Sequence, residues 1–304
     1  MSGRSPERFR GYAWVTLAVL LFSTIEVTAK FAQPGVPPFR LGFFRFFIAG
    51  LLLLPFALRD MRARGLRMNG RDLGRLAGLS IVGVVILSIC FHLGVQWVPA
   101  HQAAILFSGN PVFVAVLAPA LLGERMDARG WLALALGALG VGCLLMTGGQ
   151  GENAAVRPAD EWKGVGFTLC AMLSFAFYTV LSKRVVPRHG ILGMTSVVSL
   201  TGSLLLLPLA WAREGFPFQP MTPVEAGAVA WLAVMTTAVA YVLYFSGINR
   251  VPAARGAMLF FLKPITAMLL AWGMLAEQPG ALAIIGAVFI LAGTGTALLR
   301  TTRA

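Results

Sequence analysis

The stretch VPAHQAAILFSGNPVFVAVLAPALLGE at residues 98–124 recurs as VPAARGAMLFFLKPITAMLLAWGMLAE at residues 251–277. Eleven of the twenty-seven aligned positions are identical, and the offset between the stretches is 153 residues. The same offset, without a gap, aligns LLLLPFA at 51–57 with LLLLPLA at 204–210. Self-similarity at a fixed offset in an apolar chain predicts two homologous membrane half-bundles that face a common cavity.

The composition predicts an all-α polytopic membrane protein. Of the 304 residues, 58% are apolar and only 12% are charged, and the long apolar runs lack the period-2 alternation of barrel strands. A helix needs about 20 apolar residues to span a hydrocarbon core of about 30 Å. Ten crossings are expected, at 11–31, 38–58, 73–97, 100–122, 129–147, 162–183, 191–212, 224–248, 253–275 and 279–299.

The basic residues predict the orientation of the chain. With a cytoplasmic N-terminus, eighteen Lys and Arg residues fall on the inner face and only four on the outer face. Cytoplasmic loops carry such an excess, so both termini are expected to lie inside. The net charge of +13 therefore indicates a membrane orientation, and the lipid bilayer rather than nucleic acid is the expected partner.

The number of crossings per repeat predicts how the two repeats are related. Because five is odd, the second repeat must enter the membrane from the opposite side, which gives two inverted-topology five-helix repeats. The first repeat is expected at 11–147 and the second at 162–300. The Gly-rich, polar stretch GGQGENAAVRPADE at 148–161 is expected to join them on the outer face.

Several kinds of chemistry find no support in the sequence. Cys90, Cys143 and Cys170 lie inside apolar helices without metal-ligand spacing, so we expect reduced packing residues and no metal. There is no Walker loop, dinucleotide fingerprint, HExxH motif or nucleophile elbow. We therefore expect no catalytic residues, no cofactor and no ATP, and a transport protein rather than an enzyme.

Ionisable residues within crossings are candidates for contacts to a solute. Glu26 lies about 22 Å into the first crossing from its inner end, and Lys30 follows one turn later on the same face. Arg45 enters the second crossing from outside. These groups could bind a polar solute or a coupling proton, and an internal salt bridge among them is an equally good interpretation.

Lys263 is the strongest single candidate. It falls near the middle of the ninth crossing, and its repeat equivalent is Asn110. A lysine in the middle of the bilayer cannot easily reach the interface, and Leu259 and Ala267, one turn away on either side, are not acidic. This pattern favours a functional role for Lys263 over structural pairing.

Polar and aromatic residues form a second set of candidates. His92 and Gln96 lie in the third crossing, Tyr178 in the sixth, and Tyr241 and Tyr244 in the eighth. The two eighth-crossing tyrosines are three residues apart and share a helix face. Their rings could line a cavity and hold an apolar group or a cation.

Two further features recur at equivalent positions. Pro111 and Pro264 follow Asn110 and Lys263 directly, and each is expected to bend its helix, as a paired hinge or as a static bend. Glu124 and Glu277 follow the fourth and ninth crossings, where a loop or cap role is more consistent with their positions than a gate.

Taken together, the repeat motifs resemble those of the EamA-type drug/metabolite transporter superfamily. The resemblance rests on VPAxxAxxLFxxxPVF with LLGER in the first half and VPAARGAMLFFLKP with AEQ in the second. It implies that crossings one, three, four, six, eight and nine surround the cavity. The remaining crossings would be peripheral, which argues against Arg45 as a contact to the solute.

The same resemblance implies a function. It suggests ATP-independent export of small metabolites across the bacterial inner membrane, and the chain is similar to amino-acid exporters of the YddG type. We expect alternating access, a small-molecule substrate such as an apolar or aromatic amino acid, and a monomer rather than an obligate oligomer. Efflux of cationic drugs, nucleobases or other metabolites, and a passive channel, stay open as alternatives.

Overall fold

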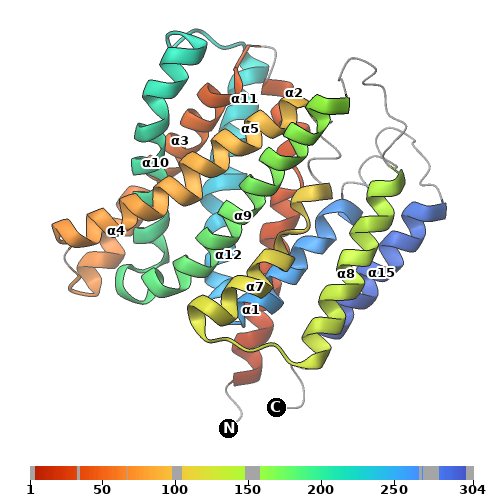
Figure 1. The fold of residues 1–304 in the computed structure, drawn as a ribbon. Coiled ribbons are helices and arrows are strands. Elements are labelled where there is room, and N and C mark those ends of the chain that lie inside the picture. Colours follow the sequence, from red (N-terminus) through yellow and green to blue (C-terminus); the bar gives the residue numbers. More distant parts are fainter. Residues whose placement is uncertain are drawn as a thin grey trace.

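The computed structural model describes residues 4–32, 35–66, 68–97, 105–147, 158–266, 269 and 281–298. Within these residues the regular elements are all helices (Figure 1). The elements of the first half are α1 (Arg4–Phe22), α2 (Ile25–Ala32), α3 (Pro38–Ala63), α4 (Gly70–Ser80), η1 (Ile81–Ile86), α5 (Leu87–Trp97), α7 (Asn110–Leu122) and α8 (Ala128–Thr147).

The elements of the second half begin with one long helix. They are α9 (Pro158–His189), α10 (Ile191–Glu214), α11 (Pro223–Trp231), η3 (Leu232–Val239), α12 (Ala240–Ile248), α13 (Ala253–Ala257), η4 (Met258–Phe261) and α15 (Ala281–Leu298).

Within the described residues, seven helices are long and apolar enough to cross a membrane. They correspond to the second through eighth predicted crossings, and they span Pro38–Ala63, Gly70–Phe91, Ile105–Leu122, Ala128–Met146, Trp162–His189, Ile191–Glu214 and Pro223–Ile248. In the tenth predicted crossing the apolar helical stretch is the shorter Ile284–Thr296. The ninth crossing is described continuously only to residue 266.

The first crossing differs from the prediction of one continuous helix. α1 ends at Phe22 and α2 begins at Ile25, with a turn at Ser23 and Thr24. The Ser23 hydroxyl donates to the Val19 carbonyl, and that of Thr24 donates to the Leu21 carbonyl, both at 2.8 Å. Such side-chain bonds to the preceding turn compete with the helical hydrogen-bond ladder, which explains a break at this point.

The third and eighth crossings share a local irregularity. Each contains a short π-helical segment, η1 and η3, of six and eight residues, in which the turns are wider than those of an α-helix. The offset of 153 residues places Ile81–Ile86 on residues 234–239, inside η3. Wide turns of this kind are uncommon and often occur at functional sites, so their recurrence shows that the duplication extends to local backbone geometry.

The helices pair across the two halves of the chain. α3 packs along α10 and α8 along α15, while α1 packs against α12 and α5 against α9. Figure 1 shows α8 and α15 together at one edge of the bundle, and α3 and α10 at the other.

Glycines make the closest of these contacts possible. A Cβ atom on Gly247 of α12 would lie 2.5 Å from the Gly11 carbonyl oxygen of α1, and one on Gly94 of α5 would lie 3.3 Å from the Gly164 oxygen of α9. Gly11 and Gly164 are repeat equivalents, as are Gly94 and Gly247. The close contact between α1 and α12 is thus repeated between α9 and α5, as expected for small residues at membrane helix interfaces.

We call the end of the bundle at which α1 begins the N-terminal end, which lies at the bottom of Figure 1. At the opposite end, the Glu214 carboxylate accepts from the backbone nitrogens of Phe39 and Arg40 at 2.9 and 2.7 Å. These bonds satisfy two donors that the first turn of α3 would otherwise leave without partners. They also fix α3 to the end of α10.

Candidate functional site

A cavity lies between the two halves of the bundle. It encloses about 770 Å³ of space that protein atoms leave empty, part of it open to solvent. Its walls include the end of α1, α2 and the first turns of α3, so it lies in the half of the bundle away from the N-terminal end. The lining residues are Phe22, Ile25, Ala29, Leu41, Gly42, Arg45, Phe46, Leu87, Ser88, Phe91, Phe107, Phe175, Leu232, Tyr241, Phe260 and Lys263.

Repeat equivalents meet in the cavity wall. Phe22 and Phe175 are equivalents, and so are Phe107 and Phe260. The rings pack on one another: the centroid of Phe175 lies 5.7 Å from that of Phe107 and 5.5 Å from that of Phe260. Phe22 stacks on Phe260 at 5.7 Å. We call these four phenylalanines the aromatic layer.

Two cationic side chains line this largely apolar cavity. Lys263 is only 4% exposed, and its Nζ lies 5.6 Å from the centroid of the Phe107 ring. Arg45 donates from Nε to the Thr237 hydroxyl of η3 at 2.6 Å, and its guanidinium lies 5.3 Å from the centroid of Phe46. Both cations therefore lie beside aromatic rings. The attraction between a cation and the face of a ring stabilises a positive charge that few waters surround.

The position of Arg45 corrects one expectation. The family resemblance places the second crossing at the periphery and argues against Arg45, yet Leu41, Gly42, Arg45 and Phe46 of α3 all line the cavity. α3 packs against α10 on one side and against η3 on another. The first half of α3, which packs on η3, therefore faces the cavity. The charge of Arg45 within an apolar run was the signal in the sequence for this role.

Of the three predicted tyrosines, only Tyr241 lines the cavity. Tyr178 and Tyr244 are 1% and 0% exposed and lie outside the lining, so the expectation that Tyr244 contacts the cavity is wrong for this conformation. The Tyr244 ring stacks on Phe175, and its hydroxyl lies 3.1 Å from the Thr179 hydroxyl. A buried phenol needs such a partner, and Thr179 supplies it.

Asn110 is fully buried and does not line the cavity. Within the described part of the chain, neither its amide nitrogen nor its oxygen has a hydrogen-bond partner. A buried amide without partners costs free energy, so another state of the protein, or a bound solute or water, is expected to satisfy it. Its repeat equivalent, Lys263, lies in the wall.

Four predicted residues have side chains outside the part of the chain that the structure describes. They are Glu26, Lys30, His92 and Gln96. Ile25 and Ala29 of α2 and Phe91 of α5 line the cavity. The contacts of the four side chains themselves stay predictions.

The two predicted hinge prolines lie at interruptions of helical structure. Pro111 is in the first turn of α7, directly after the turn at Ser108 and Gly109, so it begins a helix rather than bending one from within. Pro264 follows the 3₁₀ segment η4, which ends at Phe261. A proline is tolerated in the first turn of a helix because the nitrogen there has no helical partner.

The described side chains of the site offer binding chemistry. Within the described residues, no group of three or more His, Cys, Asp or Glu side chains is placed to hold a metal ion. Cys90 and Cys170 are free thiols with sulfur atoms 3.4 Å apart on α5 and α9. The cavity instead combines two cations with aromatic and aliphatic walls, which suits a small molecule with an anionic group and an apolar part.

Comparison with known proteins gives the family. The profile of the EamA-like transporter family matches the chain twice, at residues 9–146 and 162–299. A solved crystal structure shares the fold, with a TM-score of 0.76 at 21% identity over 96% of this chain and 98% of the other.

Relatives with full-length similarity carry transporter names. An uncharacterized transporter of Clostridium kluyveri is 28% identical and aligns over 94% of this chain and 92% of its own length. A probable terminal-alkyne amino-acid exporter of Streptantibioticus cattleyicolor is 26% identical, over 84% and 86%. An S-adenosylmethionine uptake transporter of Rickettsia prowazekii is 23% identical, over 93% and 90%. The chain is thus a multi-pass membrane protein of the EamA-like transporter family, and a transporter rather than an enzyme.

Proposed function

We propose that this protein is a secondary transporter that exports small amphipathic metabolites from the bacterial cytoplasm across the inner membrane. Its substrates are amino acids, including those with apolar or aromatic side chains. The two halves are inverted repeats of five crossings each, at 11–147 and 162–300, joined by an outer linker. They rock about the central cavity so that it faces one side of the membrane at a time.

The cavity wall is the observation that carries this proposal. Lys263 and Arg45 offer positive charge to a carboxylate, while Phe22, Phe107 and Tyr241 offer ring faces to an apolar side chain. A cation beside a ring in a site with little water interacts strongly with an anion, because few waters compete for it. The combination therefore favours a carboxylate with an apolar side chain over a purely polar solute.

The symmetry of the packing supports inverted repeats. α1 with α12 and α9 with α5 are equivalent pairs under the offset of 153 residues. Equivalents also pair with each other at both edges of the bundle, α3 with α10 and α8 with α15. A two-fold relation between the halves accounts for both patterns. The basic bias of eighteen residues to four then directs both termini toward the cytoplasm.

The names of the relatives support the proposed substrate class more than the proposed direction of transport. One of them is named a probable amino-acid exporter, which agrees with a carboxylate site. Another is named an uptake transporter for S-adenosylmethionine, which is itself an amino-acid derivative. Direction in a secondary transporter follows from gradients and coupling, so both directions are compatible with one cavity.

Efflux of cationic drugs or of nucleobases is the second candidate. A cationic drug would have to tolerate Lys263 and Arg45 in the wall, and like charges at close range in a largely apolar cavity repel one another. A neutral nucleobase could stack on the aromatic rings without using either cation.

A substrate panel in proteoliposomes separates these candidates. The assay measures uptake of labelled phenylalanine in the presence of unlabelled competitors. The competitors are phenylalanine, leucine, the two amines that lack their carboxylates, and a nucleobase. We expect the two amino acids to compete and the two amines to fail. Competition by the amines as strong as that by the two amino acids would indicate that the carboxylate is not recognised and would favour cationic efflux. Strong competition by the nucleobase with none by leucine would indicate stacking without carboxylate recognition.

A further inference from the structure

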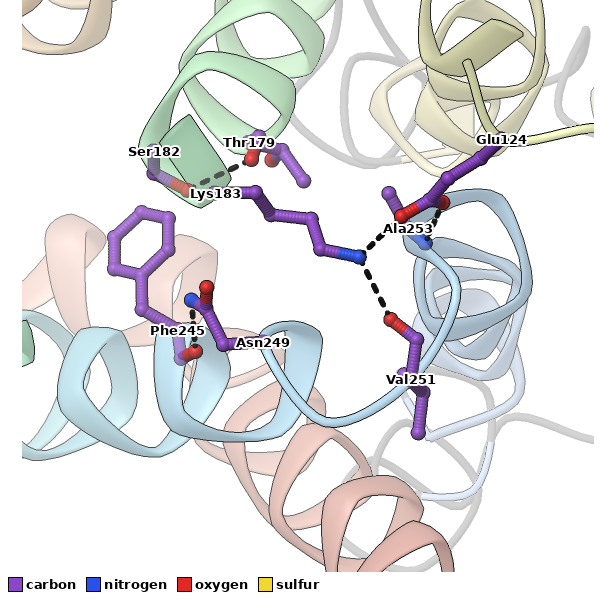
Figure 2. A network of polar contacts seen from close by, with 8 residues as sticks. All are labelled: Glu124, Thr179, Ser182, Lys183, Phe245, Asn249, Val251 and Ala253. Atoms are coloured by element: carbon purple, nitrogen blue, oxygen red, sulfur yellow. Dashed lines mark hydrogen bonds and ion pairs between the residues drawn. The ribbon is translucent and has the colours of Figure 1, made fainter. Parts of the chain in front are cut away.

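A network of polar contacts joins the loop after α7 to α9 and to the start of α13 (Figure 2). The Nζ atom of Lys183 donates to Oε1 of Glu124 at 2.5 Å and to the Val251 carbonyl oxygen at 2.9 Å. The other oxygen of Glu124 accepts from the backbone nitrogen of Ala253 at 2.6 Å. Glu124 therefore satisfies the first backbone donor of α13 and binds a lysine at the same time, whereas the sequence favoured a loop or cap role over a gate.

This network connects both repeats. Glu124 follows α7 of the first repeat, whereas Lys183 belongs to α9 and Ala253 begins α13 of the second. A nearby ion pair between Arg255 and Asp127, at 2.9 Å, joins the same loop to the same short helix. A rocking motion of one half against the other must therefore stretch or break these contacts.

The network lies between the cavity and a second pocket. Along α9, Phe175 lines the cavity, Thr179 bonds Tyr244 below it, and Lys183 follows one turn later, about 12 Å from Phe175. On the other side, Glu124 lines a polar pocket of about 600 Å³ of empty space, together with Arg8, Tyr12, Arg125, Met126, Pro252, Ala254 and Arg255. The network and the aromatic layer thus separate the two spaces.

The sequence repeats the whole network. Under the offset of 153 residues, Glu124, Lys183, Val251 and Ala253 correspond to Glu277, Lys30, Val98 and Ala100, and all four residue types are identical. The side chains of these equivalents lie outside the described part of the chain. The recurrence indicates that the contact belongs to the duplicated unit, since an incidental ion pair of one half would have no reason to recur.

We propose that the Lys183, Glu124 and Ala253 contacts form a latch that closes the path between the N-terminal end and the cavity, and that this latch opens in each transport cycle. The proposal rests on alternating access. The side chains of Lys183 and Glu124 are 14% and 26% exposed. A partly exposed ion pair contributes little net stability, which suits a contact that must break repeatedly.

The test measures access from the N-terminal side, without any substrate. In a variant whose native cysteines are replaced, Thr179→Cys places a thiol between the latch and the cavity. An impermeant maleimide is applied separately to inside-out and right-side-out vesicles. We expect Glu124→Gln and Lys183→Met each to raise the labelling rate several-fold from the N-terminal side only. Asp60→Asn is the matched control, because its partner Arg64 is the C-cap residue of the same helix, α3, so this ion pair is local.

Equal labelling rates in all four proteins would overturn the latch, provided that each protein elutes as a folded species in detergent. If one latch variant fails to fold, the other still decides the result. Failure of the substrate panel would leave the labelling result standing. Conversely, normal amino-acid transport together with equal labelling rates in the latch variants and the parent protein would reject the latch and leave the proposed function standing.

Discussion

The rings of Phe22 and Phe175, which are repeat equivalents 153 positions apart, lie edge to face with their centroids 6.4 Å apart. Phe22 belongs to the first repeat and Phe175 to the second, so this contact joins the two halves of the chain. Phe260 packs on both rings, at 5.7 and 5.5 Å. The aromatic layer therefore joins the two repeats in the wall of the cavity.

Phe175→Ala is expected to destabilise the protein strongly. Phe175 is 3% exposed and contacts Phe22, Phe107, Tyr244 and Phe260. Truncating a buried aromatic ring leaves a cavity and typically costs about 3–5 kcal/mol. Equilibrium unfolding in detergent micelles measures this change in the free energy of unfolding.

The control for this variant is Phe56→Ala, since Phe56 is 52% exposed on α3. This substitution should leave the free energy of unfolding close to that of the wild type. Equal stability of the Phe175 and Phe56 variants would mean that the aromatic layer does not hold the two halves together.

Gly247→Ala is expected to force α1 and α12 apart. A new Cβ atom would lie 2.5 Å from both the Gly11 carbonyl oxygen and a methyl carbon of Val15. Overpacking of this kind costs about 1–3 kcal/mol. Gly142→Ala is the matched comparison, because nothing lies within 4 Å of its Cβ position. Thermal melts in the same detergent should separate the variants, and a Gly247 variant as stable as the Gly142 variant would contradict the close contact.

The orientation is tested by labelling in intact cells. Because basic residues are concentrated on one face, Leu66→Cys should be protected from an impermeant thiol reagent and Asn153→Cys should react. The native cysteines lie in apolar helices and would be replaced beforehand. The reverse pattern would invert the whole topology.

Pro111→Ala and Pro264→Ala are expected to shift the resting conformation in opposite directions. Each removes the restriction that proline places on its own φ angle and on the preceding residue at an interruption of helical structure. The two sites are equivalents in halves that we propose to be inverted. Cysteine accessibility at the two mouths of the path reports the shift. If both variants keep the wild-type pattern, the interruptions are static packing features.

The apolar runs predict most of the helices, because length and hydropathy suffice to place a crossing. They do not predict the break at Ser23 and Thr24, which depends on side-chain bonds to the helix backbone. The mid-membrane charge of Lys263 correctly indicated a cavity residue. Arg45 and Tyr244 show the limit, because the side of a helix that faces a cavity follows from tertiary packing.

Counterflow in proteoliposomes tests the central claim most directly. Vesicles loaded with unlabelled substrate are diluted into labelled substrate at a trace concentration. An alternating-access transporter should accumulate label transiently above its equilibrium level, whereas Lys263→Ala should reconstitute normally and lose most of this overshoot. An unsaturable flux without overshoot in the wild type, or an overshoot unchanged by Lys263→Ala, would contradict exchange through this cavity.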